Sequence, residues 1–559
     1  MRFLKITLLI TLFFTTVNSS LLAQEENNFE ISKNIEIYGD VIRQLNLNYA
    51  DNIKPGDLNK TAIDAMLKSM DPYTVYIPES KMEDYELMSK GEYGGIGAMI
   101  QKQDNWVIIS EPYEGFPAQM AGLRAGDQIR AIDGESTEGK NTKDVSEKLK
   151  GTPGTIVHVT VHHFGSETDT TYNITRKKVK IPNVPYYGMV SNDIGYIYLT
   201  QFNPNAGNDV KNAFLSLKKQ NSNMKGVIFD LRSNGGGLLN EAVKIANIWI
   251  PKNRLIVKTI GKRKENTHTY STQFSATDAK IPLVILVNGN TASASEIVSG
   301  SIQDYDRGII IGQRTFGKGL VQNVIPIAYN SKIKVTIAKY YIPSGRCIQA
   351  INYFHRRTGD GPSKVPDSLI NAFKTKGGRT VYDGGGIEPD IKLKTEKFSQ
   401  VTADLYAGNY FFNFANLYVE QHDSIPDPGV FMISDSLFDA FKNFVGDTLN
   451  YKTETEEVIK QLKESANRED YLQSIDSTIQ KLTDEVKNEK KKDIDKNKKE
   501  IKQLLRLEIV TRYYYQKGKV QSALLDDPEV AKAIEVINNS NLYNSILKGT
   551  YHPENKENK

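Results

Sequence analysis

Four short apolar runs in the middle of the chain constrain its fold more than any other feature. They span residues 194–199, 226–231, 282–287 and 308–311, and a polar or glycine-rich loop follows each of them. Strands that read as nearly continuous apolar runs are buried on both faces of a sheet, which is typical of α/β proteins. The sequence therefore predicts an α/β core, which we place at residues 181–395.

The rest of the chain divides into regions of different pattern. At about 150 residues per domain, 559 residues predict three to four domains. Residues 24–90 have the apolar spacing of short helices, and residues 91–180 alternate β-rich segments with glycine turns. Residues 396–559 have a helical and charged pattern, and their lysine-rich stretch 484–503 indicates a solvated helix face rather than a binding patch. We expect a multidomain chain with helical regions at both ends.

The first 23 residues have the pattern of a secretory signal. Arg2 and Lys5 form a basic start, residues 6–17 are an apolar run too short to span a bilayer comfortably, and Ala23 ends a small and polar exit. Leu21 is bulky for its place before the cleavage point, so an uncleaved membrane anchor is the alternative. We expect an exported, periplasmic protein that is soluble once the signal is removed.

Composition and motifs exclude several kinds of chemistry. With 71 basic and 67 acidic residues the net charge is +4, so the chain is not a polycation built for nucleic acid. Its one cysteine, Cys347, excludes an internal disulfide and a zinc ribbon. The seven histidines contain no metal-binding pair, and Gly319 stands where the P-loop-like run 312–319 would need a serine or threonine for magnesium. We predict no metal and no cofactor.

A region of glycine loops and short strands at residues 91–180 resembles a PDZ domain. Its loop leads into a strand at 98–100, and a short helix with a glycine turn follows at 117–127. Backbone N–H groups of such a loop can converge on a carboxylate, and the adjoining strand edge can accept an extended peptide. The alternative is a simple tight turn. The loop residues that we expect to bind a peptide's C-terminus are Gly94, Gly95, Ile96 and Gly97.

A serine-rich turn, 291–296, follows the third apolar run and opens a helix. The unpaired N–H groups of a helix start can stabilise an oxyanion beside a serine nucleophile, although the serines could also act only as helix caps. No histidine motif supplies a base. A lysine can serve if burial removes its charge, since an ordinary lysine has a pKa near 10.4. Lys318 lies between two glycines that permit a tightly packed turn, and Gln322 can hold its amine by a neutral hydrogen bond.

Together these motifs resemble the C-terminal processing (tail-specific) peptidase family. They comprise 230–238, 291–297, Gln303-Asp304, 315–319, Val321-Gln322 and 383–390, in that order. The resemblance implies a crotonase- or ClpP-like protease core with an inserted PDZ domain. It implies Ser293 as nucleophile, Lys318 as general base, Gln322 as the residue that orients the lysine, and Asp304 in a structural role. The backbone N–H groups of Ala294 and of Gly235 or Gly236 would form the oxyanion hole.

We therefore expect an exported serine endopeptidase that recognises protein C-terminal tails through its PDZ domain and cleaves through an acyl-enzyme, without a metal or cofactor. Its partners would be protein substrates with exposed, apolar C-termini. We expect it to bind no nucleic acid. An adaptor or activator protein and a homo-oligomer stay open. The alternatives are a catalytically inactive peptide- or lipid-binding protein on the same fold, and a PDZ scaffold for another protease.

Overall fold

The computed structural model describes residues 28–82, 85, 91–353, 363–364, 366–394, 397–446, 449 and 451–551. The predicted signal segment, 1–23, lies outside the described residues. The chain forms two compact units, one of Met1–Glu79 with Gln322–Thr336 and the other of Ser80–Val321 with Ile337–Lys559. Among the described residues, none of the helices is long and apolar enough to cross a bilayer.

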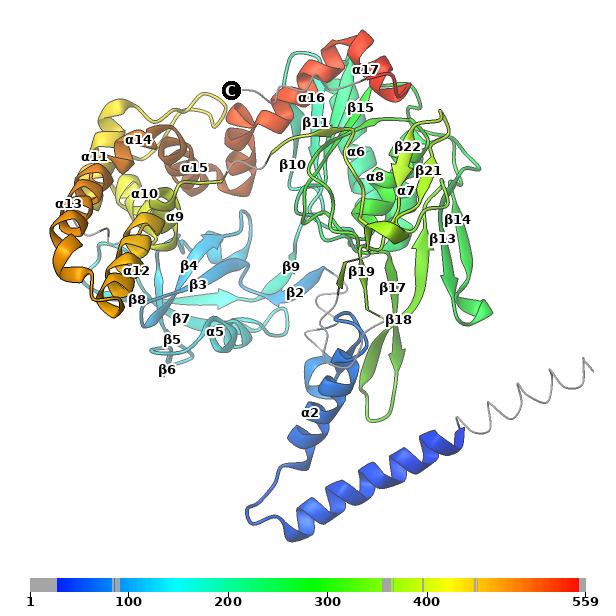
Figure 1. Ribbon diagram of the computed structural model, residues 1–559, viewed down its shortest axis with the longest axis horizontal. Coiled ribbons are helices and arrows are strands. Elements are labelled where there is room, and N and C mark those ends of the chain that lie inside the picture. Colours follow the sequence, from blue (N-terminus) through cyan, green and yellow to red (C-terminus); the bar gives the residue numbers. More distant parts are fainter. Residues whose placement is uncertain are drawn as a thin grey trace, which may run out of the picture. The chain divides into compact units, whose positions relative to one another are not determined.

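The predicted α/β core is a six-stranded sheet in the larger unit, drawn mostly in green in Figure 1. Its strands from β11 to β23 run parallel, and β10 pairs antiparallel at one edge. Every residue of β12, β15 and β16 is buried, as the apolar runs predict. In spatial order the strands are β10 (Tyr186–Met189), β11 (Ile194–Tyr198), β12 (Gly226–Asp230), β15 (Leu283–Val287), β16 (Ile309–Gly312) and β23 (Ile391–Lys392).

Helices cover both faces of this sheet, and alternate residues of each strand face opposite layers. Val227 and Phe229 of β12 pack in one cluster with α6 (Ala206–Gln220), α7 (Leu239–Trp249) and α8 (Ala294–Asp304). Ile228 faces the other way, toward α16 (Pro528–Asn538) and α17 (Ser540–Leu547). Figure 1 shows these two helices, in red, beside the sheet. The last helices of the chain therefore pack on the α/β core, although they lie in the predicted C-terminal helical region that begins at residue 396.

Three loops follow the carboxyl ends of neighbouring parallel strands. The glycine loop, residues 231–237, follows β12, the serine loop, 288–293, follows β15, and the lysine loop, 313–319, follows β16. The register places Asp230 beside Leu286 and Val287 beside Gly312, so all three loops begin at the same edge of the sheet. Ligand sites of open α/β sheets lie at this edge.

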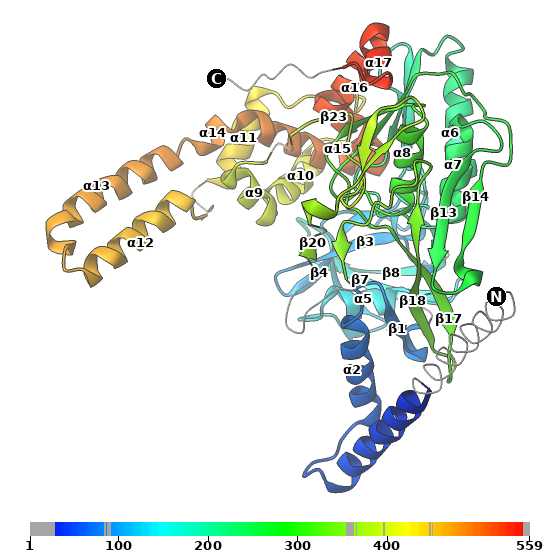
Figure 2. The same ribbon diagram turned by 45° about the vertical axis from the view of Figure 1, so that its right-hand side comes forward.

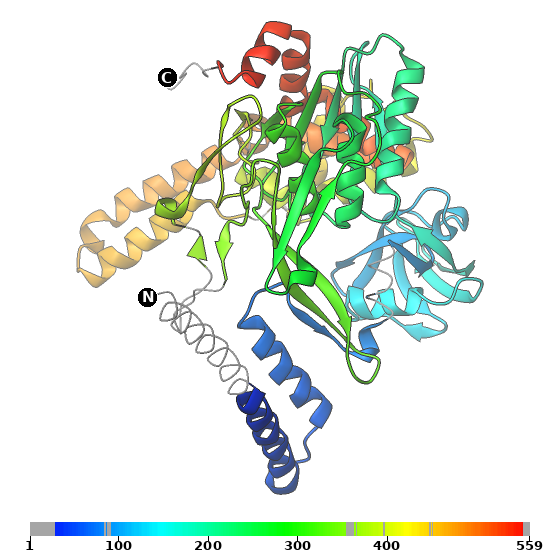
Figure 3. The ribbon, with the colours of Figure 1, turned by 90° about the vertical axis from the view of Figure 1, so that its right-hand side faces the viewer.

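The predicted PDZ region is a small domain whose entering and leaving strands pair with each other. β2 (Glu92–Gly95) and β9 (Lys177–Lys180) form this pair, and Figure 3 shows the domain in cyan. Its other strands form a sheet in which β3 lies at an edge within the described residues. The elements are β3 (Ala98–Gln103), β4 (Trp106–Pro112), β5 (Gln128–Ile132), β6 (Glu135–Ser136), β7 (Ile156–His162), β8 (Asp169–Thr175), α4 (Pro117–Met120) and α5 (Thr142–Leu149).

Within the described residues of the range 396–559, the predicted helical character is confirmed. A cluster of buried aromatic and aliphatic side chains, including Phe411, Phe438, Phe441 and Leu505, holds most of these helices together. Figure 2 shows α12 and α13 as a long hairpin. The helices are α9 (Gln400–Ala407), α10 (Tyr410–Gln421), α11 (Asp435–Val445), α12 (Glu454–Arg468), α13 (Leu472–Lys490), α14 (Asp493–Lys496) and α15 (Lys498–Ala523).

The smaller unit contains a helix at 28–48, α2 (Pro55–Lys68) and one strand that the helical prediction missed. Tyr38 Oη donates to Asn59 Oδ1 at 2.8 Å and joins the two helices. The strand is β1 (Val75–Ile77), whose β-branched and aromatic residues favour extended structure and pair with β18.

The strands not yet named belong to several small sheets. They are β13 (Leu255–Gly261), β14 (His268–Ser271), β17 (Leu320–Pro326), β18 (Lys332–Tyr341), β19 (Ile351–Asn352), β20 (Ser363–Lys364), β21 (Ala372–Lys374) and β22 (Thr380–Tyr382).

Candidate active site

Ser293 occupies the turn between β15 and α8. It is the residue that precedes the first turn of α8, and its backbone has φ 58° and ψ −116°. A residue other than glycine rarely adopts a positive φ, and such strain is held in place by its surroundings, commonly at functional sites. The side chain is half-buried. A strained strand-to-helix turn of this kind presents a serine at the edge of a sheet, as a nucleophile requires.

Lys318 lies in a lysine loop that is packed as tightly as its glycines predicted. Gly317 has φ 82°, and a Cβ atom there would lie 2.4 Å from the Cβ of Ala350. The Gly317 carbonyl accepts from the N–H of Ala350 at 2.9 Å, and the Gly319 N–H donates to Gln349 Oε1 at 2.7 Å. Glycine is therefore required at position 317, and the loop fixes the backbone of Lys318.

A single buried carboxylate brings the serine and lysine loops together. Glu296 Oε2 accepts from the backbone N–H of Ser293 at 2.8 Å and from the backbone N–H of Lys318 at 2.9 Å. Its other oxygen accepts from the N–H of Gly317 at 2.7 Å and from Thr315 Oγ1 at 2.5 Å. The backbone nitrogens of the two predicted dyad residues therefore lie within two hydrogen-bond lengths of each other.

The charge state of Glu296 decides whether this arrangement holds. Burial raises the pKa of Glu296 to about 7, although the hydrogen bonds from Thr315 and from the N–H groups of Lys318, Ser293 and Gly317 lower it. All four of these groups act as donors here, so the ionised carboxylate satisfies them and a protonated one would lose an acceptor. Sequence analysis did not single out Glu296, because a serine followed three residues later by glutamate reads as an ordinary capping box.

Tyr340 is a second residue that the sequence analysis missed. Its side chain is buried, and its hydroxyl lies 3.1 Å from the carbonyl oxygen of Ser293. The same hydroxyl is also hydrogen-bonded to the carbonyl oxygen of Lys318. Tyr340 lies on β18, and no short motif links it to either loop. The carbonyl groups of Ser293 and Lys318 thus share one hydroxyl, as their N–H groups share one carboxylate.

The glycine loop contacts the serine loop through Asn234. The carbonyl of this buried residue accepts from the N–H of Ala292 and from Ser295 Oγ, both at 3.0 Å. Its side-chain oxygen accepts from the N–H of Gly236 at 2.9 Å. Within the described residues, the N–H groups of Gly235 and Ala294 make no hydrogen bond. Of the two glycines predicted for the oxyanion hole, Gly235 is therefore the one with an available donor.

We expect Gly236→Ala to lower kcat/KM by at least about 100-fold, while Gly235→Ala keeps most activity. Gly236 has φ 95°, and a Cβ atom there would lie 2.8 Å from the Ala294 nitrogen and 2.9 Å from the Cβ of Ser293. Around Gly235 the corresponding space is empty within 4 Å, and the alanine keeps its N–H. Steady-state cleavage of an unfolded protein, with circular dichroism for the fold, compares the two. Equal activities would show that the contact between these loops does not matter.

The other predicted residues have separate surroundings. Gln322 belongs to the smaller unit, where its Nε2 donates to Thr336 Oγ1 at 3.2 Å, and its role toward the lysine stays a prediction. Asp304 lies at the far end of α8 and forms an ion pair with Arg346 at 2.9 Å, with both side chains fully buried. It also accepts from the N–H of Ser344. These contacts favour the structural role expected for Asp304.

The structure places two of the four residues of the predicted peptide-binding loop in a strand. Gly94 and Gly95 are strand residues of β2, paired with Lys178 and Lys177. Only Ile96 and Gly97 lie between β2 and β3. Their carbonyl groups accept from the N–H groups of Ala118 and Tyr113, at 2.8 and 2.9 Å. Within the described residues the structure gives their own N–H groups no acceptor. A carboxylate site here would use these two groups, beside the edge strand β3.

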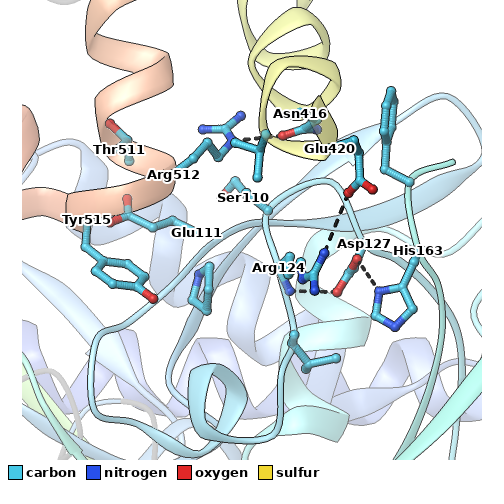
Figure 4. A pocket seen from close by; sticks show the side chains of 15 residues that line it. Ser110, Glu111, Arg124, Asp127, His163, Asn416, Glu420, Thr511, Arg512 and Tyr515 are labelled. Atoms are coloured by element: carbon cyan, nitrogen blue, oxygen red, sulfur yellow. Dashed lines mark hydrogen bonds and ion pairs between the residues drawn. The ribbon is translucent and has the colours of Figure 1, made fainter. Parts of the chain in front are cut away.

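A separate pocket lies where the small domain that follows β2 meets α10 and α15 (Figure 4). Arg124 forms an exposed ion pair with Glu420 at 3.6 Å, and Asp127 is hydrogen-bonded to His163 at 2.7 Å. None of the predicted dyad or oxyanion residues lines this pocket. The described residues also contain no group of three or more histidine, cysteine or acidic side chains suited to a metal ion.

Three family models match the chain. Peptidase family S41 matches residues 193–353, and a PDZ domain matches residues 108–162. A model described as the C-terminal helical domain of a probable PDZ-protease matches residues 401–537. The matches fall on the α/β core, the small inserted domain and the helical region of the structure.

The chain is also similar to curated relatives and to one solved structure. The carboxy-terminal-processing protease of Bartonella bacilliformis is 33% identical over 351 residues, which are 62% of this chain and 78% of the relative. A probable CtpA-like serine protease of Staphylococcus aureus is 31% identical over 399 residues, 71% of this chain and 72% of that protein. The solved photosystem II D1 C-terminal processing protease is 29% identical with a TM-score of 0.36, and the match covers 63% of this chain and 86% of that one.

Proposed function

Because the chain belongs to the carboxy-terminal-processing proteases of peptidase family S41, we propose that it cleaves proteins through a dyad of Ser293 and Lys318 after binding their C-terminal tails. The family makes the chain a serine-type peptidase with a PDZ domain. One observation carries the choice of dyad: the same oxygen of Glu296 accepts from the backbone N–H groups of both residues.

In the proposed reaction, Ser293 Oγ attacks the scissile carbonyl carbon and its proton passes to the neutral Nζ of Lys318. The negative charge on the carbonyl oxygen is stabilised by the N–H groups of Ala294 and Gly235. Lys318 then gives the proton to the leaving amine, which leaves an acyl-enzyme on Ser293. Water, deprotonated by Lys318, hydrolyses that ester and restores the serine. No step needs a metal or a cofactor.

Tail recognition is assigned to the PDZ domain. The N–H groups of Ile96 and Gly97 would bind the terminal carboxylate, and the peptide would extend β3 as an added strand. Ile96 is buried in one apolar cluster with Val145 and Leu149 of α5, which favours an apolar last residue. The substrates would be proteins with exposed apolar C-termini, while an adaptor or activator protein and a homo-oligomer remain open proposals.

The proposed site of action is outside the cytoplasm, most simply the periplasm. The support is the sequence pattern of residues 1–23, a basic start followed by a short apolar run. Processing of the N-terminus tests this proposal. Mass spectrometry of protein from the periplasmic fraction should find a chain that begins after Ala23, whereas an intact Met1 in membranes would indicate an anchor.

Amidating a substrate's C-terminus, or ending it in aspartate, should slow cleavage several-fold or more. A built carboxylate site left unmatched costs about 1–3 kcal/mol. Cleavage of one unfolded protein with a free apolar, an amidated and an aspartate terminus measures the effect, and Ser293→Ala is the inactive control. Equal rates for the free and amidated tails would mean that residues 96–97 form only a turn. No cleavage of any tail would favour the inactive peptide- or lipid-binding protein.

A further inference from the structure

The glycine loop is held from outside by the first turn of α16. Arg232, in this loop, bonds Asp230 at the end of its own strand and two acidic residues of the C-terminal region. Its Nη2 lies 2.7 Å from Asp527 Oδ2, and its Nη1 lies 2.5 Å from Glu529 Oε2. The exposed fractions of the Arg232, Asp527 and Glu529 side chains are 20%, 14% and 12%, so water screens these ion pairs little.

Glu529 reaches a second loop of the site with its other oxygen. Glu529 Oε1 accepts from Gln313 Nε2 at 2.5 Å, and Gln313 is the first residue of the lysine loop. One carboxylate of α16 therefore binds the loop that carries Gly235 and the loop that carries Lys318. The proposed reaction depends on how these two loops are placed relative to each other.

Asp527 pairs with Arg232 and also caps the start of α16, so the ion pair depends on where the helix lies. Its Oδ1 accepts from the N–H groups of Glu529 and Val530, at 2.9 and 3.0 Å, and so caps the helix. Further along α16, Val530, Ala533 and Val536 pack against the sheet in the same cluster as Ile228. The helix is thus seated on the sheet by its apolar face, and its charged first turn points to the loops.

We propose that Asp527 and Glu529 are positioning residues that set the geometry of the glycine and lysine loops. The end of the C-terminal helical region then completes the active site from 209 and 211 residues beyond Lys318 along the chain. This inference rests on the proposed function. A misplacement of reacting groups by 1 Å can cost about 100-fold in rate, whereas tail binding at the PDZ domain does not involve these loops. The expected effect is therefore on kcat.

The double variant Asp527→Asn/Glu529→Gln tests the inference. Asparagine is as good a helix cap as aspartate, so the variant removes both charges from Arg232 and keeps the cap of α16. We expect kcat to fall roughly 10- to 100-fold, with KM and the binding of a fluorescent tail peptide unchanged. Glu535→Gln is the matched control, because Glu535 lies on the same helix and pairs with Lys532 at the surface. It should retain the kcat of the parent protein.

Adding Arg232→Gln separates positioning from a general loss of stability. Because Arg232 also pairs with the buried Asp230, the triple variant should lose stability as well, whereas the double variant keeps that pair and should lose kcat without a matching fall in melting temperature. An unchanged kcat in the double variant would overturn the inference, as would equal loss in the Glu535→Gln control. If the double variant does not fold, Glu529→Gln alone should still lower kcat at constant KM, and an unchanged kcat there would overturn it too. Cleavage by Ser293→Ala would instead overturn the proposed function.

Discussion

Ser293→Ala and Lys318→Ala should each reduce cleavage by at least about 10,000-fold while the protein stays folded, because neither residue of a dyad works without the other. The double variant should be no slower than either single variant, since the groups act as a unit. The expectation follows from the two loops that share Glu296 and Tyr340. Initial rates on an unfolded protein with an apolar C-terminus, with melting curves of each variant, measure it.

Ser299→Ala is the matched control for the serine. Ser299 lies six residues further on, buried within α8, and its Oγ donates to the carbonyl of Ser295 at 2.9 Å within the helix. It should retain most of the activity. Ser295 would be a poorer control, because its hydroxyl donates to the carbonyl of Asn234 in the glycine loop. Full activity in Ser293→Ala, or additive losses in the double variant, would contradict the dyad.

Glu296→Gln should lower kcat by roughly 30- to 1,000-fold. The amide replaces one acceptor by an NH₂ donor that faces the donors around it, and losing hydrogen bonds to a buried charged group costs about 2–4 kcal/mol. Glu241→Gln is the control, because Glu241 is a buried carboxylate in the first turn of α7 that accepts from the N–H of Gly207 at 2.8 Å. The control should lose stability without a comparable loss of kcat.

The pH dependence of Glu296 has opposite signs for activity and for stability. Its folded pKa of about 7 lies above its ordinary value of 4.5. Its contribution to stability is therefore complete below pH 4.5 and is lost as the pH rises through 7. Activity needs the ionised form and should fall as the pH drops below 7. Between pH 8 and 5.5, kcat should decrease while the melting temperature of the parent, relative to Glu296→Gln, increases. Parallel decreases would mean that acid simply unfolds the protein.

Much of the core could be predicted because the information is local. The runs that form β12, β15 and β16 are apolar at nearly every position. Strands with this pattern are stable mainly when both of their faces are buried between two layers. Parallel neighbours then place their following loops at one edge. Ser293 and Lys318 come together for this reason, and Gly317 takes the positive φ that its place in a tight turn suggests.

The missed features depend on partners distant in the chain. Gly94 and Gly95 read as a loop, yet β9 supplies Lys178 and Lys177 to pair with them. The difference between Gly235 and Gly236 is an exception, because Asn234, which accepts from the N–H of Gly236, lies only two residues away, and the folded loop decides which N–H it takes. The first turn of α16 has the charged pattern of a surface helix start, and only the packing of its apolar face on the sheet brings its acids to Arg232. Sequence spacing carries no signal for such contacts.

Covalent labelling with a serine-reactive fluorophosphonate, followed by mass spectrometry, tests the central assignment most directly. The parent protein should carry one adduct, on Ser293, and tail substrate should slow its formation. Lys318→Ala should not be labelled, because its serine lacks a base. An adduct on Ser295 or another serine in the parent, or undiminished labelling of Ser293 in Lys318→Ala, would contradict a dyad of Ser293 and Lys318.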